Sequence, residues 1–208
     1  MPRLLHSRSG ATLVEVILAI TLLAVIAYQG VTVLSSATEA STEDTAEVML
    51  EDQAEVVLER IAKAILGSSR ESLQPAADAP FTTEDLRYQV HLGIEDGEVV
   101  WSDPEMIGLE DVNESKLFWA SNPDEADSQR VVWTNLVRPY LEGEIPNGMD
   151  DNGNGIIDEK GLSFVVDRRA VTIRLSLARQ TDDGEPIVTT VQTTVTCRHE
   201  DEEPDVAP

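Results

Sequence analysis

The chain has 208 residues, a length that suits one substantial domain with an anchor rather than two independent cores. Its 15 Lys and Arg stand against 39 Asp and Glu, for a formal net charge of −24. An acidic surface of this kind repels phosphate backbones, which argues against nucleic acid and favours cations or basic protein patches as partners. The single cysteine, Cys197, excludes an internal disulfide and is expected as a half-buried strand thiol.

The amino terminus combines a short basic segment with a long apolar one. Residues 1–10 contain Arg3 and Arg8 but no acidic residue, and the 19 residues from Val16 to Leu34 carry no charge. As a helix, this uncharged stretch would span roughly 28 Å, close to the thickness of the hydrocarbon core of a bilayer. The positive-inside rule keeps the basic segment in the cytoplasm and places the acidic remainder across the membrane.

Glu15 lies at the edge of this apolar stretch, where a carboxylate is costly unless a partner compensates its charge. A cut after Gly10 would give Ala11 a free amino group and make Glu15 the fifth residue of the shortened chain. The carboxylate could then pair with an amino terminus, either its own or that of a neighbouring subunit in a filament.

The segment Ser9–Glu15 (SGATLVE), followed by the apolar run, resembles the processing site of type IV pilins and type II secretion pseudopilins. The resemblance implies that a prepilin peptidase cuts after Gly10, that the amino group of Ala11 is methylated, and that Glu15 guides assembly. Ala11 departs from the family, which usually has Phe at this position. The resemblance also favours a minor pseudopilin, and the size of the head, its expected sheet content and the continuation Ala27–Gly30 suggest the J-type. Such a subunit sits in the bacterial inner membrane with a periplasmic head and joins other pilin-like subunits in a short filament.

An ordinary secretory signal is the alternative for the amino terminus, with small residues such as Ser35 to Ala37 at its end. That alternative explains the basic segment. It explains neither Glu15 nor the glycine placed before the apolar run.

Residues 35–69 are expected to continue the transmembrane helix of residues 11–34 as an amphipathic second half. Apolar residues recur there at helical spacing, at Ala46, Leu50, Ala54, Val57, Ile61, Ala64 and Ile65. Ser41 and Asp44 resemble a capping box, which leaves a restart of the helix open, although one long helix is favoured. Gly67 to Ser69 is the expected end of the helix.

The head, residues 70–198, is expected to be rich in antiparallel strands that follow a linker loop over Glu71–Pro80. The clearest strand is Ala170–Arg179, which alternates apolar and polar residues and is expected to pair with Ile187–Cys197. Other strands are predicted at Leu86–Ile94, Glu98–Trp101, Lys116–Ala120, Arg130–Leu141 and Leu162–Val166. The acidic tail, residues 199–208, is expected to be disordered. The predicted fold class is α+β, a long N-terminal helix packed on an antiparallel sheet in the manner of pilins.

An EF-like loop over residues 150–161 is the strongest motif in the head. Hard Ca²⁺ takes six to eight oxygen ligands, which side chains at alternate positions can supply when a glycine permits a sharp turn. The candidate ligands are Asp150, Asn152, Asn154, the backbone carbonyl of Ile156, Asp158 and Glu159. Gly161 stands where an EF-hand loop has its bidentate glutamate, and Glu159 or a water is expected to replace it. The sequence predicts a structural Ca²⁺ site, with a metal-free Asn/Gly/Asp turn as the alternative.

Patterns typical of an enzyme do not occur in the sequence. There is no nucleophile elbow, phosphate loop, CxxC or HExxH. A structural subunit is therefore favoured over a secreted enzyme. A minor pilin of a type IV pilus, or a membrane-anchored calcium-dependent binding module that keeps residues 1–10, are the remaining alternatives.

Overall fold

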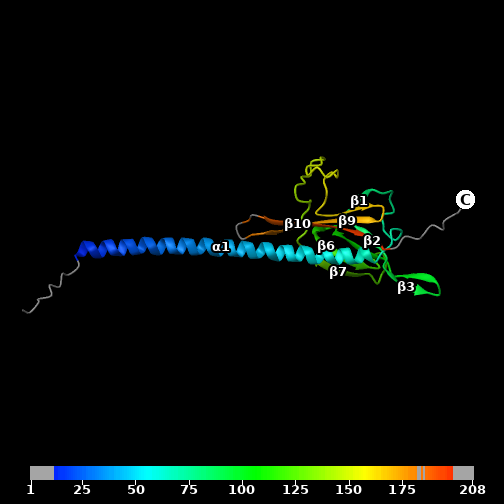
Figure 1. The fold of residues 1–208 in the computed structure, drawn as a ribbon, viewed down its shortest axis with the longest axis horizontal. Coiled ribbons are helices and arrows are strands. Elements are labelled where there is room, and N and C mark those ends of the chain that lie inside the picture. The colour runs from blue at the N-terminus through cyan, green and yellow to red at the C-terminus, as the bar shows by residue number, and fades with distance from the viewer. Residues whose placement is uncertain (1–11, 182–183, 185, 199–208) are drawn as a thin grey trace, which may run out of the picture. The chain divides into compact units, whose positions relative to one another are not determined.

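The structure is a computed structural model that describes residues 12–181, 184 and 186–198 (Figure 1). The predicted leader over residues 1–10, Ala11 and the predicted acidic tail lie outside the described residues. The chain divides into two compact units, residues 1–45 and 46–208, and each is described by itself.

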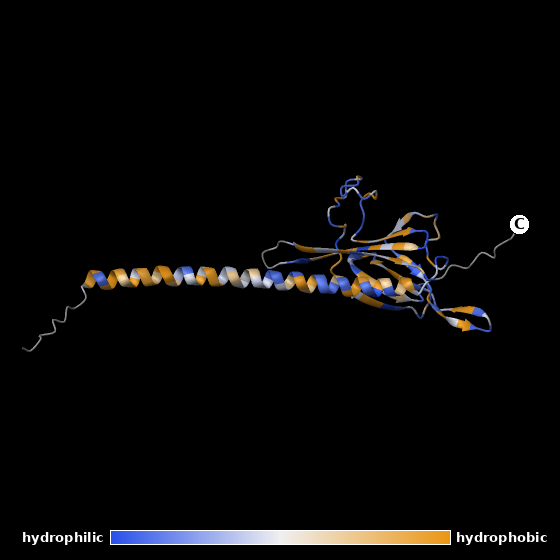
Figure 2. Cartoon of the chain, viewed as in Figure 1, coloured by the Kyte–Doolittle hydropathy of each residue, from blue (hydrophilic) through white to orange (hydrophobic). Residues whose placement is uncertain are grey.

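One long helix, α1 (Leu13–Leu66), starts in the first unit and ends in the second. It is continuous at Ser41, whose carbonyl accepts a hydrogen bond from Thr45 Oγ1 at 2.7 Å, so the helix does not restart there. In the first unit its apolar side chains are exposed, and no residue in its most apolar 18-residue window is buried. Figure 2 shows the start of the helix largely in the orange of hydrophobic residues. The helix is long and apolar enough to cross a membrane, which confirms the prediction of a long apolar N-terminal helix.

In the second unit, α1 buries one stripe of side chains. Leu50, Ala54, Val57, Ile61 and Ile65 are each 2% exposed or less. These positions are separated by three or four residues, so they fall on a single helix face. The expected amphipathic stripe is therefore present, and it forms part of the core of the head.

The described strands of the head form two four-stranded antiparallel sheets and one hairpin. The first sheet has the order β1 (Phe81–Thr83), β8 (Leu162–Asp167), β9 (Ala170–Gln180), β10 (Pro186–Thr196). The second has the order β2 (Leu86–Tyr88), β5 (Glu105–Glu110), β6 (Asn113–Ser121), β7 (Gln129–Thr134). The hairpin pairs β3 (His91–Glu95) with β4 (Glu98–Trp101) across a turn at Asp96 and Gly97, which have φ of 53° and 88°. This arrangement of helix and antiparallel sheets is an α+β fold.

Strand β9 has the alternation predicted for it. Val171, Ile173, Leu175 and Leu177 are fully buried, and β9 pairs with β10 along its whole length. Cys197 follows β10 and is also fully buried, deeper than the predicted half-buried thiol. Burial raises the pKa of this thiol, which keeps it protonated and unreactive at neutral pH.

Three of the predicted segments have a different structure. The expected strand Leu86–Ile94 is two strands, β2 and β3, because its two halves pair with different partners. The expected strand Arg130–Leu141 ends at Thr134, after which the chain leaves the second sheet and Val137 bridges to β9. The predicted linker Glu71–Pro80 contains the fully buried Leu73, so part of it belongs to the core.

Candidate functional site

The predicted processing site is described only in part, since Gly10 and Ala11 lie outside the described residues. Glu15 lies in the first turn of α1. Its backbone N–H donates to the carbonyl of Thr12 at 3.0 Å and to Thr12 Oγ1 at 3.4 Å, so Thr12 caps the helix.

A threonine cap followed three residues later by glutamate is the order of a capping box, and a negative charge is favourable in the first helical turn. The Thr12–Glu15 spacing is visible in the sequence but was not among the predicted capping signals. Helix capping is therefore a second physical reason for a carboxylate at position 15, beside pairing with an amino terminus.

The predicted EF-like loop belongs to a longer excursion, residues 142–158, that is closed at its base. There the N–H of Leu141 donates to the carbonyl of Glu159 at 2.9 Å, and Tyr140 and Lys160 form an antiparallel bridge. The Lys160 ammonium also lies 4.9 Å from the centroid of the Tyr140 ring. The excursion is the yellow loop that leaves the strands in Figure 1.

Asp150 organises the tip of this loop. Its Oδ1 accepts the N–H groups of Gly153 at 2.7 Å and Asn154 at 3.1 Å, and its Oδ2 accepts that of Gly155 at 2.7 Å. Gly153 and Gly155 have φ of 74° and 89°, a conformation that favours glycine. The sharp turn expected at Gly155 is therefore present, and it wraps the backbone around the Asp150 carboxylate.

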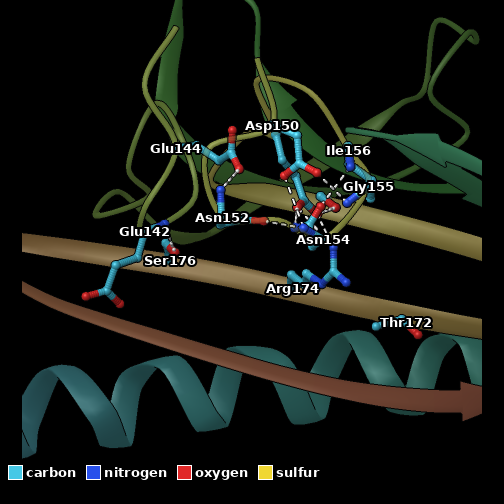
Figure 3. A network of polar contacts seen from close by, with 12 residues as sticks. Glu142, Glu144, Asp150, Asn152, Asn154, Gly155, Ile156, Thr172, Arg174 and Ser176 are labelled. Atoms are coloured by element: carbon cyan, nitrogen blue, oxygen red, sulfur yellow. Dashed lines mark hydrogen bonds and ion pairs between the residues drawn. The ribbon is translucent and has the colours of Figure 1, made fainter. Parts of the chain in front are cut away.

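Asn152 and Asn154 continue the same pattern. Asn152 Oδ1 accepts the N–H of Asn154 at 3.0 Å, and Asn154 Oδ1 accepts the N–H of Ile156 at 2.8 Å. Figure 3 shows the side chains of Asp150, Asn152 and Asn154 gathered in one loop. Three of the predicted ligands thus lie together, each with its oxygen occupied by a neighbouring backbone N–H.

The Asp158 carboxylate binds backbone amides outside the turn around Asp150. Its Oδ1 accepts the N–H of Asn147 at 3.0 Å, and both of its oxygens lie 3.0–3.1 Å from the N–H of Gly148. This carboxylate therefore holds the earlier part of the excursion. To reach a cation beside Asp150 it would have to leave these amides.

Glu159 fastens the loop to the first sheet. Its side chain has no exposed surface, and its two oxygens lie 2.9 and 3.0 Å from Arg174 Nη1 on β9. Its Oε2 also accepts Asn154 Nδ2 at 2.7 Å, and its Oε1 accepts the hydroxyl of Ser163 on β8. Because Arg174 neutralises it, Glu159 contributes little charge to a cation in the loop.

Gly161 occupies its position for a steric reason. A Cβ built on it would lie 1.9 Å from the carbonyl oxygen of Arg138, and its own carbonyl accepts the N–H of Ser176 at 2.7 Å. No side chain fits there. The glutamate that ends an EF-hand loop therefore cannot stand at this position of the chain.

Glu144 is a residue of the loop that sequence reasoning missed. It is 5% exposed, and its Oε1 accepts the N–H of Asn152 at 3.3 Å. Its Oε2 is buried without a hydrogen-bond partner. It precedes the motif by six residues, and no spacing rule in the sequence distinguishes it from the neighbouring acidic residues.

The donor set of the loop suits a hard cation, because its carboxylate and amide oxygens are the ligands that Ca²⁺ prefers. Asp150, Asn152 and Asn154 lie in one turn, where their side-chain oxygens accept backbone N–H groups. In the described part of the chain, no three His, Cys, Asp or Glu side chains converge as a metal cluster. The loop thus brings the side-chain amides of Asn152 and Asn154 together with the Asp150 carboxylate. The Asp158 and Glu159 carboxylates bind other groups.

Comparison of the chain with protein-family models, curated proteins and solved structures gave no match.

Proposed function

We propose that this protein is a structural pilin-like subunit, a minor pseudopilin of a type II secretion pseudopilus and of the J-type by its sheet-rich head. Prepilin peptidase removes residues 1–10, and the first part of α1 then anchors the chain in the inner membrane. The same helix afterwards packs with other pilin-like subunits in a short periplasmic filament. The role is structural rather than enzymatic.

The observation that carries this proposal is the exposed apolar surface of α1 in the first unit, with Glu15 in its first turn. From Val16 to Leu34 the helix has no charged residue, and no side chain of its most apolar window is buried. Such a surface needs lipid or other apolar helices around it. A membrane before assembly and neighbouring helices after assembly satisfy this need in turn.

Intact-mass measurement of the protein extracted from membranes tests the proposal. Loss of residues 1–10, with the mass of one added methyl group at Ala11, is the expected result. Retention of Met1 would instead support an anchored binding module, and loss of about forty residues would support a secretory signal. Either outcome contradicts the proposal.

The gene neighbourhood separates the two filament types. A type II secretion pseudopilin is expected beside genes for a secretion ATPase, a prepilin peptidase and other pseudopilins. Genes for a type IV pilus at that place would favour the minor-pilin alternative.

We also propose that the EF-like loop binds one structural Ca²⁺. Asp150, Asn152 and Asn154 would hold it through side-chain oxygens, with the carbonyl of Ile156 from the same turn. Asp158 and Glu159 would join only by leaving their present partners, the Asn147 and Gly148 amides and Arg174. Bound Ca²⁺ would neutralise the loop carboxylates and order the excursion.

Calorimetric titration of the full chain in detergent with CaCl₂ tests this second proposal. Heat of binding that disappears in Asp150→Asn is the expected result, since this change removes the charge around which the tip is wound. Absence of binding in the unmodified protein would favour a metal-free turn.

A further inference from the structure

We infer that Glu144 is a ligand of the cation held by the EF-like loop, and that it supplies the carboxylate that the loop cannot carry at Gly161. This inference depends on the proposed calcium site and adds a residue to it from outside the motif.

Glu144 is a buried residue whose carboxylate has one oxygen without a hydrogen-bond partner. The residue is 5% exposed, and its Oε2 has no hydrogen-bond partner. A buried carboxylate oxygen without a partner is costly, and buried charges in proteins are paired or coordinate metals. No basic side chain forms an ion pair with Glu144 among those found in the described residues. A cation would supply the partner that this oxygen lacks.

Glu144 contacts the EF-like loop at Asn152. Its Oε1 accepts the N–H of Asn152, a predicted ligand, at 3.3 Å (Figure 3). The preceding Gly143 has φ of 90°, and a Cβ built on it would lie 3.5 Å from Asn152 Cβ. The backbone around Glu144 therefore packs directly on the loop, and the carboxylate is held against it.

The carboxylates of Asp158 and Glu159, near the loop, already have partners. Position 161 accepts no side chain, because the Arg138 carbonyl occupies the space of a Cβ. The Glu159 carboxylate is paired with Arg174, and the Asp158 carboxylate is held by backbone amides. Glu144 is the buried carboxylate at the loop that keeps an oxygen open.

Two carboxylates, Asp150 and Glu144, would then face the ion together with the amide oxygens of Asn152 and Asn154. Affinity of such oxygen sites increases with the number of charged ligands. A divalent cation that prefers irregular oxygen coordination, Ca²⁺ rather than Mg²⁺, is the ligand that this set favours.

The test is calorimetric titration of the full chain in detergent with CaCl₂ and, separately, with MgCl₂. We expect Glu144→Gln, which keeps the shape of the side chain and removes its charge, to weaken Ca²⁺ binding by roughly tenfold or more. The matched control is Glu142→Gln. Glu142 lies in the same excursion, but its carboxylate accepts a hydrogen bond from Thr190 Oγ1 on β10 at 2.8 Å and not from a residue of the EF-like loop. This control should bind Ca²⁺ as the unmodified protein does.

The outcomes separate this inference from the calcium proposal itself. Absence of Ca²⁺ binding in the unmodified protein would overturn both. Unchanged binding in a folded Glu144→Gln, with binding lost in Asp150→Asn, would overturn the role of Glu144 alone. If circular dichroism shows that Glu144→Gln is unfolded without Ca²⁺, Glu144→Asp decides. Weakened binding in this shortened variant supports the inference, and unweakened binding overturns it.

Discussion

The carboxylate of Glu159 and the guanidinium of Arg174 form an ion pair between the foot of a long loop and the middle of strand β9, with Nη1 2.9 Å from Oε1 and 3.0 Å from Oε2. The side chain of Glu159 has no exposed surface, and that of Arg174 is 19% exposed. A buried charge pair, rather than apolar packing, thus attaches the excursion to the first sheet at this point.

Arg174→Met should lower the free energy of unfolding by about 3–5 kcal/mol, because it leaves the Glu159 charge buried without its cation. Urea unfolding at neutral pH, followed by tryptophan fluorescence, measures the change, since Trp101, Trp119 and Trp133 all lie in the head. The double variant Glu159→Met with Arg174→Met should recover much of the loss, since apolar pairs often replace buried ion pairs without cost. An Arg174→Met variant as stable as the unmodified protein would show that the Glu159 carboxylate does not depend on Arg174 for its stability.

This ion pair marks a limit of reasoning from the sequence. The alternation of β9 predicted which face of the strand is buried, and it put Arg174 on the opposite face. It could not predict that a loop fifteen residues away covers Arg174, because pairing between a strand and a distant loop leaves no period in the sequence. The EF-like motif similarly predicted the turn around Asp150 but not the turning of Asp158 toward other amides.

Gly161→Ala should destabilise the head by about 1–3 kcal/mol or more, since the added methyl group would lie 1.9 Å from the Arg138 carbonyl oxygen and backbone must move to admit it. Gly93→Ala is the matched control. Gly93 lies in strand β3, whereas Gly161 directly precedes β8, and an added Cβ at Gly93 meets nothing within 4 Å. Thermal unfolding compares the two variants. Equal melting temperatures would contradict the close approach at Gly161.

Tyr88→Phe should change the dependence of stability on pH. The Tyr88 hydroxyl lies 2.7 Å from Glu105 Oε2 and accepts the Trp119 indole N–H at 3.1 Å. Burial, and then the charge of Glu105, raise the pKa of this phenol. Above pH 10, where an unfolded tyrosine releases its proton, the folded protein keeps it, so rising pH favours unfolding.

Urea unfolding between pH 8 and pH 11 measures this effect. The unmodified protein should lose stability above about pH 10, and Tyr88→Phe should lose less over the same interval. At neutral pH the variant should be less stable by about 1.5–3 kcal/mol, because the hydroxyl donates to the Glu105 carboxylate and also accepts the Trp119 N–H. The same decline in both proteins would show that the raised pKa does not contribute.

Glu15→Val should leave membrane insertion and cleavage intact and impair filament assembly, because it removes the carboxylate proposed to pair with an amino terminus. Cross-linking of subunits in membranes, with intact mass as the measure of cleavage, tests this. Thr12→Ala is the control, since it removes the helix cap and keeps the carboxylate. Normal assembly in Glu15→Val contradicts the pairing. An equal defect in both variants would assign Glu15 to helix capping alone.

Elements with a regular apolar repeat could be predicted from the sequence, and short strands or strands without such a repeat could not. The stripe from Leu50 to Ile65 and the alternation of β9 are local patterns, and the structure contains both. Strands β1 and β5 were missed. β1 has three residues, and β5 (EMIGLE) contains Gly108 and lacks a strict alternation of apolar and polar residues.

The bridge between Tyr140 and Lys160 joins the two ends of the excursion. Because those ends already meet, the number of residues between them can vary without disturbing the register of either sheet. The excursion between Tyr140 and Lys160 can therefore be replaced by another loop. Related chains could carry a shorter loop, or one that binds a different ligand, on an otherwise unchanged head. For the same reason, an epitope or a fluorescent label introduced at the loop tip should report on the head without displacing its strands.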